Sequence, residues 1–232
     1  MSGPALKVRG LAKAFVLHVQ GGVRLPVLDG VSVAVHPGEC VVLADPSGAG
    51  KSTLLRSIYG NYLVREGQVL VRHRERVVDM VGAPPRVVLD VRRHSLGYVS
   101  QFLRVIPRVP AEQVVAGTLR ARGVEAGPAL ARARAVLERL RVPERLWALS
   151  PVTFSGGEQQ RVNVARVFVA DYPILLLDEP TASLDAVCRL AVVELIREAR
   201  ARGAAVLGIV HDAEVRAQVA TRVRTLAGTE AA

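Results

Sequence analysis

The stretch Val41–Thr53, VVLADPSGAGKST, decides the fold of this chain. It matches the phosphate-loop pattern G-x-x-x-x-G-K-[ST] at every fixed position except the first, where Asp45 replaces glycine. Gly48 and Gly50 allow backbone N–H groups to turn towards an anion, and the following helix adds the positive end of its dipole. The pattern predicts a nucleotide-binding loop between a buried strand at Cys40–Ala44 and a helix at Lys51–Tyr59.

The side chains of this loop are typical of phosphate binding. Lys51 offers a positive charge to the β- and γ-phosphates, and the Ser52 hydroxyl is placed to ligate Mg²⁺. ATP and Mg²⁺ are therefore the expected cofactors. The predicted nucleotide-binding residues of the loop are Asp45, Pro46, Ser47, Gly48, Ala49, Gly50, Lys51, Ser52 and Thr53.

Asp45 raises the question of whether the loop still holds a nucleotide. A non-glycine residue in a strained backbone conformation costs about 1–3 kcal/mol. A carboxylate roughly 6 Å from a phosphate charge is repelled by about 3 kcal/mol per pair at an effective dielectric near 20. Asp45 lies at the loop entrance, where its side chain has room to turn away. We expect the loop to bind ATP, but more weakly than a glycine version would.

Length and composition favour one globular domain over residues 1–232, of which 50% are hydrophobic. No stretch approaches the roughly 18–20 apolar residues that span a bilayer, and the N-terminus lacks the apolar segment of a signal peptide. Cys40 and Cys188 are too few for a disulfide framework. The expectation is a cytoplasmic protein without direct membrane insertion.

The formal net charge of +10 invites a nucleic-acid interpretation. The arginines are scattered in short groups such as VRHRERVV, and no aromatic stacking platform accompanies them. The charge therefore fits a biased composition better than a groove for polyanions, and nucleic acid is not an expected partner.

The remaining pattern predicts an α/β fold. Short apolar runs with turn signals over residues 5–45 and 67–81 indicate antiparallel strands. Residues 102–170 are helical in pattern, with Leu130, Ala133, Leu137 and Leu140 at helical spacing. The continuous apolar runs in YPILLLDEP and AAVLGIVHD, separated by a helix at 186–202, are typical of a parallel sheet.

Two acidic residues end the first of these runs. Paired carboxylates at the end of a buried strand are costly without a cation nearby. We assign Asp178 to the coordination shell of Mg²⁺ and Glu179 to the polarisation of the attacking water.

The segment FSGGEQQRVNVAR indicates a second anion site. Ser155 and Glu158 have the spacing of a capping box, and Gly156 and Gly157 leave the start of the helix bare. A bare helix N-terminus attracts anions. One phosphate loop and one further anion site in a single chain suggest that two domains enclose each nucleotide.

With these motifs in this order, the chain resembles the ATP-binding cassette (ABC) ATPases over nearly its whole length. The resemblance implies a P-loop NTPase with a mostly parallel core sheet, an antiparallel β subdomain and an inserted helical subdomain at about 102–170. It implies that Phe15 stacks on adenine, that Gln101 senses the γ-phosphate and Mg²⁺, and that His211 is the switch histidine.

The resemblance also groups the site residues. Catalysis would involve Glu179, His211 and Gln101, and the metal would be held by Ser52, Gln101 and Asp178. The signature motif, which acts on the nucleotide of a second subunit, would comprise Ser155, Gly156, Gly157, Glu158 and Gln159. The D-loop would comprise Ser183, Leu184 and Asp185.

A narrower resemblance, notably at Tyr59–Tyr62 and Phe102–Pro110, is to the PhnL family of ABC-type subunits of the carbon–phosphorus lyase system. It implies a cytoplasmic ATPase that acts with the lyase core complex in phosphonate degradation, at the step that joins a phosphonate to the ribose of ATP to give ribose 1-phosphonate triphosphate. The alternatives are the nucleotide-binding subunit of a membrane transporter, of lipoprotein-release or macrolide-export type, and a non-catalytic scaffold. Either a homodimer or a heterodimer with a sister ABC subunit fits the motifs.

Overall fold

A computed structural model describes residues 3–17, 22–103 and 107–226 of the chain. The elements of the first half are β1 (Leu6–Leu17), β2 (Val23–Val35), β3 (Cys40–Leu43), α1 (Lys51–Ile58), β4 (Glu66–His73), β5 (Arg76–Asp79), α2 (Pro85–His94) and β6 (Leu96–Val99). Those of the second half are α3 (Ala111–Arg120), α4 (Ala126–Arg139), α5 (Glu144–Trp147), the 3₁₀ turn η2 (Pro151–Thr153), α6 (Gly156–Phe168), β7 (Ile174–Asp178), α7 (Ala186–Ala201), β8 (Ala205–Ile209), α8 (Ala213–Val219) and β9 (Arg222–Arg224).

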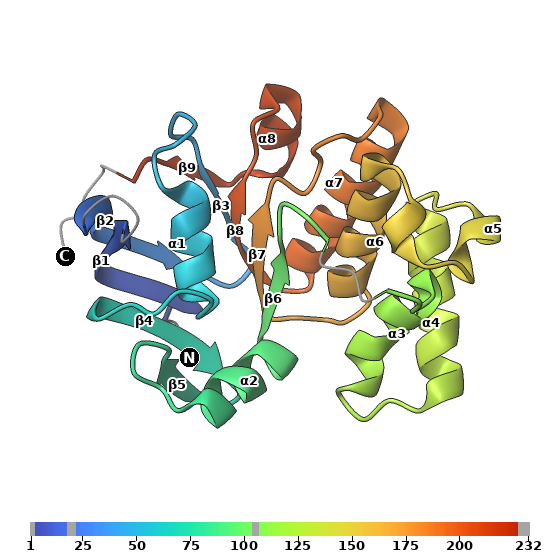
Figure 1. Ribbon diagram of the computed structural model, residues 1–232, viewed down its shortest axis with the longest axis horizontal. Coiled ribbons are helices and arrows are strands. Elements are labelled where there is room, and N and C mark those ends of the chain that lie inside the picture. Colours follow the sequence, from blue (N-terminus) through green and yellow to red (C-terminus); the bar gives the residue numbers. More distant parts are fainter. Residues whose placement is uncertain (1–2, 18–21, 104–106, 227–232) are drawn as a thin grey trace.

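Within the described residues the strands form two sheets. One is antiparallel with the order β2-β1-β4-β5, and the other is parallel with the order β6-β7-β8-β3-β9. Figure 1 shows the antiparallel sheet on one side of the parallel sheet and the helices α3–α5 on the far side. The predicted combination of a parallel core, an antiparallel subdomain and a helical subdomain is confirmed.

The parallel sheet separates two hydrophobic cores. Along β7, Ile174 and Leu176 face the core shared with α1 and the antiparallel sheet, whereas Leu175 and Leu177 face the core shared with the helices. All four are almost fully buried. Neighbouring side chains of a strand point to opposite faces, so a strand buried on both faces needs the continuous apolar run that the sequence shows.

The helical lobe agrees with its pattern in type and differs in detail. Ala133, Leu137 and Leu140 are fully buried as predicted, but Leu130 is only partly buried because Ala129 takes the buried position. Residues 85–94, which carried no helix prediction, form α2. Two adjacent prolines at its start indicate a turn, yet Pro85 stands at the first helical position, where proline is tolerated.

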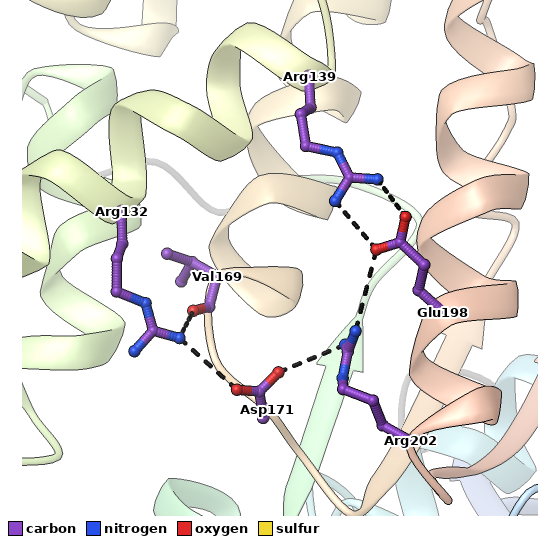
Figure 2. A network of polar contacts seen from close by, with 6 residues as sticks. All are labelled: Arg132, Arg139, Val169, Asp171, Glu198 and Arg202. Atoms are coloured by element: carbon purple, nitrogen blue, oxygen red, sulfur yellow. Dashed lines mark hydrogen bonds and ion pairs between the residues drawn. The ribbon is translucent and has the colours of Figure 1, made fainter.

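An ionic network joins α4 of this lobe to α7 of the core (Figure 2). Arg139 makes a two-point contact with Glu198, at 2.6 and 3.0 Å. Asp171 lies between Arg132 and Arg202, at 3.7 and 3.4 Å, and Arg202 also approaches Glu198 at 3.9 Å. The network therefore connects the helical lobe to α7 of the core.

Candidate nucleotide-binding site

The phosphate loop leads from β3 into α1. Gly50 adopts a left-handed backbone with φ 93°, and a Cβ there would lie 2.8 Å from the Val27 carbonyl oxygen, so this position requires glycine. The buried Lys51 donates through Nζ to the carbonyl oxygens of Asp45 and Pro46, at 2.5 and 2.7 Å. The Lys51 ammonium group thus bonds the loop backbone. It would exchange these bonds for a phosphate oxygen when a nucleotide binds.

Asp45 does not strain this loop. Its φ is not positive, unlike that of Gly48 and Gly50, so the predicted backbone cost does not arise. Both carboxylate oxygens accept from the backbone N–H of Leu226, each at 2.9 Å. The side chain is therefore turned towards the segment after β9, and the predicted weakening of ATP binding by repulsion stays a prediction.

Two of the three predicted metal ligands, Ser52 and Asp178, are in contact, and the third, Gln101, lines the same cavity as Ser52. Ser52 donates through Oγ to Asp178 Oδ1 at 2.8 Å, and the Tyr98 hydroxyl donates to Asp178 Oδ2 at 3.1 Å. Burial raises the pKa of Asp178, which has no exposed surface. A hydroxyl and a carboxylate are oxygen ligands that suit Mg²⁺, which takes its other ligands from phosphates and water. The pair fits such an ion, and no cluster of three or more His, Cys, Asp or Glu suited to metal occurs in the described chain.

Glu179, the predicted catalytic carboxylate, lies beside its predicted partner His211. His211 Nε2 lies 3.1 Å from Glu179 Oε1. Glu179 has a left-handed backbone with φ 54°, and its N–H donates to the Ile209 carbonyl at 3.1 Å. Its carbonyl accepts from Gln160 Nε2 of α6 at 3.1 Å. A non-glycine residue in this region is uncommon and is held there by its surroundings.

A cavity of about 330 Å³ collects most of these groups. It is lined by Val27, Ser47, Gly48, Gly50, Lys51, Ser52, Thr53, Gln101, Glu179, Ile209 and His211. The structure thus brings the loop, the predicted sensor Gln101 and the predicted catalytic pair around one space. Asp45, Pro46 and Ala49 belong to the loop but do not line the cavity, and Asp178 is reached from it through Ser52.

Phe15 lies apart from this cavity. Its ring packs edge-on against Tyr62, with centroids 5.2 Å apart, and Lys13 Nζ lies 5.1 Å from the ring centre. Phe15 does not line the cavity. Its predicted stacking on adenine stays a prediction.

The signature helix α6 begins as predicted. Ser155 caps it, with the Glu158 N–H donating to Ser155 Oγ at 3.3 Å and the Ser155 N–H donating to Glu158 Oε2 at 2.9 Å, which completes the capping box. Gln159 Nε2 donates to the carbonyl of Phe154 at 3.0 Å. Ser155 and Gly156 are exposed, so the start of the helix is open to solvent.

The D-loop packs against that helix. A Cβ on Gly157 would lie 2.8 Å from the Ser183 carbonyl oxygen, so the second signature glycine allows this approach. Leu184 is buried, and Asp185 caps α7 by accepting from the Cys188 N–H at 2.8 Å. A second cavity of about 280 Å³ here is lined in part by Gly156, Gln159 and Ser183. Gln101 and Glu179 line both this cavity and the loop cavity, whereas Lys51 lines only the loop cavity.

Three polar residues that carried no prediction support the site. Tyr98 bonds Asp178, Gln160 bonds Glu179, and Asn163 Nδ2 donates to the Ser100 carbonyl at 2.6 Å, beside Gln101. A buried tyrosine hydroxyl or amide needs a partner, which is the signal for these residues. For Tyr98, the identity of the partner Asp178 follows only from the strand order, which puts β6 next to β7.

This arrangement can bind a triphosphate and activate water. Lys51 and the loop residues Gly48 and Gly50 line the cavity where phosphates would lie, and a bound Mg²⁺ would neutralise developing charge there. The Glu179 carboxylate is placed to accept a proton from water, and His211 orients that carboxylate through their shared hydrogen bond. The residues therefore define a nucleoside triphosphatase site.

Comparisons with known proteins agree with this class. The family model for ABC transporters matches residues 28–182. The lipoprotein-releasing system ATP-binding protein LolD of Ruegeria pomeroyi is 39% identical over 226 residues, which cover 97% of this chain and 96% of that protein. The cell division ATP-binding protein FtsE of Bacillus subtilis is 34% identical over 188 residues, 81% of this chain and 80% of that one.

A solved dimeric structure of an ATP-binding cassette in a post-hydrolysis state, bound to ADP and Pi, has a TM-score of 0.86 and 27% identity. The matched region covers 95% of this chain and 94% of the solved chain. The chain belongs to the ABC transporter family of ATPases.

Proposed function

We propose that this chain is the ATP-hydrolysing subunit of a membrane transporter of the lipoprotein-releasing type. The identity of 39% to a protein named for lipoprotein release, over nearly the full length of both chains, carries the proposal. No relative compared above is named for phosphonate chemistry, so the transporter replaces the carbon–phosphorus lyase complex as the preferred assignment. No helix of the described residues is long and apolar enough to cross a membrane. In this proposal a permease carries out the translocation.

Two cassettes act together in this proposal. The signature helix of this chain starts in solvent, and the loop cavity has no signature residue in its lining. The similar cassette bound to ADP and Pi is dimeric. We propose that each nucleotide lies between the phosphate loop of one cassette and the signature helix of another, either a second copy or a sister subunit.

The permease would contact the surface beside Gln101. Phe102 follows it directly and is 73% exposed, and both Phe102 and Leu103 line the 280 Å³ cavity. Residues 104–106 of the same predicted segment lie outside the described residues. A large exposed ring next to the catalytic cavity suits an apolar partner whose movement follows hydrolysis.

Purification of the tagged chain from detergent-solubilised membranes of its host tests the proposal. We expect an integral permease to co-purify, and Phe102→Ser to reduce its recovery about tenfold. Val77→Ser, which changes a smaller apolar residue that is also exposed on β5 (58% exposed), is the control and should leave recovery unchanged.

A depletion experiment separates the two assignments. Loss of the chain should retain lipoproteins in the inner membrane and leave growth on a phosphonate as sole phosphorus source unchanged. Co-purification of lyase subunits without a permease, together with loss of growth on the phosphonate, would overturn the transporter proposal in favour of the phosphonate pathway.

A further inference from the structure

Asp45 connects the phosphate loop to a segment far along the chain. Its two carboxylate oxygens accept from the N–H of Leu226, 181 residues away, at 2.9 Å each. A glycine at this position has no such acceptor. Asp45, which departs from the phosphate-loop pattern, therefore makes a contact with Leu226 that a glycine could not make.

This contact extends an existing strand pairing. Strands β3 and β9 pair in parallel up to Leu43 and Arg224, and the Ala44 N–H donates to the Arg224 carbonyl at 2.9 Å. The Asp45 side chain then takes the Leu226 N–H and adds one more bond after the pairing of the two strands ends. Leu226 also packs against the core beneath the antiparallel sheet, so its position is held from two sides.

Asp45 also binds Lys51, through its backbone rather than its side chain. The backbone carbonyl of Asp45 accepts from Lys51 Nζ at 2.5 Å, while its side chain holds Leu226. Any movement of Asp45 therefore shifts both the resting place of the lysine and the link to β9. Because the carboxylate points at Leu226 and does not line the 330 Å³ cavity, it acts on the nucleotide through the backbone.

We propose that Asp45 is a positioning residue that ties the entrance of the phosphate loop to Leu226, just after β9. Nucleotide binding at the loop is thereby coupled to the strength of the Leu226 contact. The proposal rests on nucleotide binding by the family and not on which complex the chain serves. Fixing the loop in advance reduces the ordering cost when a nucleotide binds. By reciprocity, a bound nucleotide must strengthen the Leu226 contact.

The first test compares Asp45→Asn with Asp45→Ala. Asparagine keeps one acceptor oxygen without the charge, and alanine removes both oxygens. We expect the KM for MgATP to rise from wild type through asparagine to alanine, by about threefold to tenfold in all, with kcat little changed. If both variants instead lower KM to a similar extent, the carboxylate acts by repelling phosphates and the proposal is wrong; an unchanged KM in both also overturns it.

A second pair of variants reaches the contact from the other side. Leu226→Pro deletes the N–H donor, while Leu226→Ala keeps it. We expect only the proline variant to raise KM, to the level of Asp45→Ala, and the double variant to add nothing further. Additive effects of Asp45→Ala and Leu226→Pro would show that the two residues act independently, against the proposal.

Hydrogen exchange gives a readout that mere loss of stability does not reproduce. A non-hydrolysable MgATP analogue should slow exchange of the Leu226 amide in the wild type and leave it unchanged in Asp45→Ala. Equal slowing in both proteins would mean that the nucleotide reaches this segment without Asp45, and would refute the coupling.

Discussion

The two ends of the nucleotide machinery are built in opposite ways. At the phosphate loop, Lys51, Ser52 and Asp178 are buried or partly buried, and each bonds another group of the same chain. At the signature helix, Ser155 and Gly156 are exposed and the capping box satisfies only the helix itself. We call the phosphate-loop end, whose groups bond one another around a cavity, the finished half. We call the start of α6, which is open to solvent, the prepared half. The difference supports the proposal that this chain carries two complementary halves of a site, which a second cassette completes.

The largest expected effect removes the chemistry from the finished half. Glu179→Gln keeps the shape of the side chain but cannot accept a proton from water, so we expect the rate of ATP hydrolysis to fall about 10²–10⁴-fold. MgATP binding should persist, and size-exclusion chromatography should show a nucleotide-dependent dimer. Hydrolysis within threefold of wild type would place the base elsewhere in the cavity.

The next effect concerns the packing of the prepared half. Gly157→Ala places a Cβ 2.8 Å from the Ser183 carbonyl, whereas Gly156→Ala meets nothing within 4 Å. We expect only Gly157→Ala to lower the free energy of unfolding, by about 1–3 kcal/mol, measured by urea denaturation. Equal midpoints for these two neighbouring variants would show that the D-loop does not press on this helix.

A smaller effect tests the cap of the same helix. Ser155→Ala should cost about 1 kcal/mol of unfolding free energy, and Glu158→Gln should cost less because glutamine keeps the box. Hydrogen bonds from the Ser155 hydroxyl and N–H lower the pKa of Glu158 below its ordinary 4.5. A lowered pKa gives stability that is present above pH 4.5 and lost as the pH falls through the folded value.

Urea unfolding between about pH 3 and pH 6 should therefore show a steeper dependence of the free energy of unfolding on pH in the wild type than in Glu158→Gln. The same slope in both proteins would assign it to other carboxylates and remove Glu158 from the account.

The smallest effect concerns the link between the halves. Glu198→Gln breaks the two-point contact with Arg139 in the network of Figure 2, but both side chains are nearly half exposed. We expect a loss below about 1 kcal/mol that disappears near 1 M salt, measured by thermal unfolding. Glu138→Gln, which removes an exposed carboxylate of α4 that takes no part in that network, is the matched control. A loss that persists at high salt would point to packing instead of charge.

The sequence was most informative where one local rule decides. The apolar run that ends at Asp178 predicted a strand buried on both faces, and β7 (Ile174–Asp178) is such a strand. The spacing of Ser155 and Glu158 predicted a capping box, and α6 begins with one. It was least informative where long-range contacts decide. The acceptor role of Asp45 depends on Leu226, and the hydroxyl of Tyr98 depends on which strand lies beside β6. Neither partner follows from a pattern within a short window of sequence.

The left-handed peptide at Glu179 has one further consequence. Such a backbone stores about 1–3 kcal/mol that neighbouring contacts must hold in place. One of those contacts is the amide of Gln160, which belongs to the signature helix. A tilt of that helix would therefore displace the main chain of Glu179, the predicted catalytic base. In the proposed dimer, a hydrogen bond within one chain therefore connects the helix that faces one nucleotide to the residue that acts on the other.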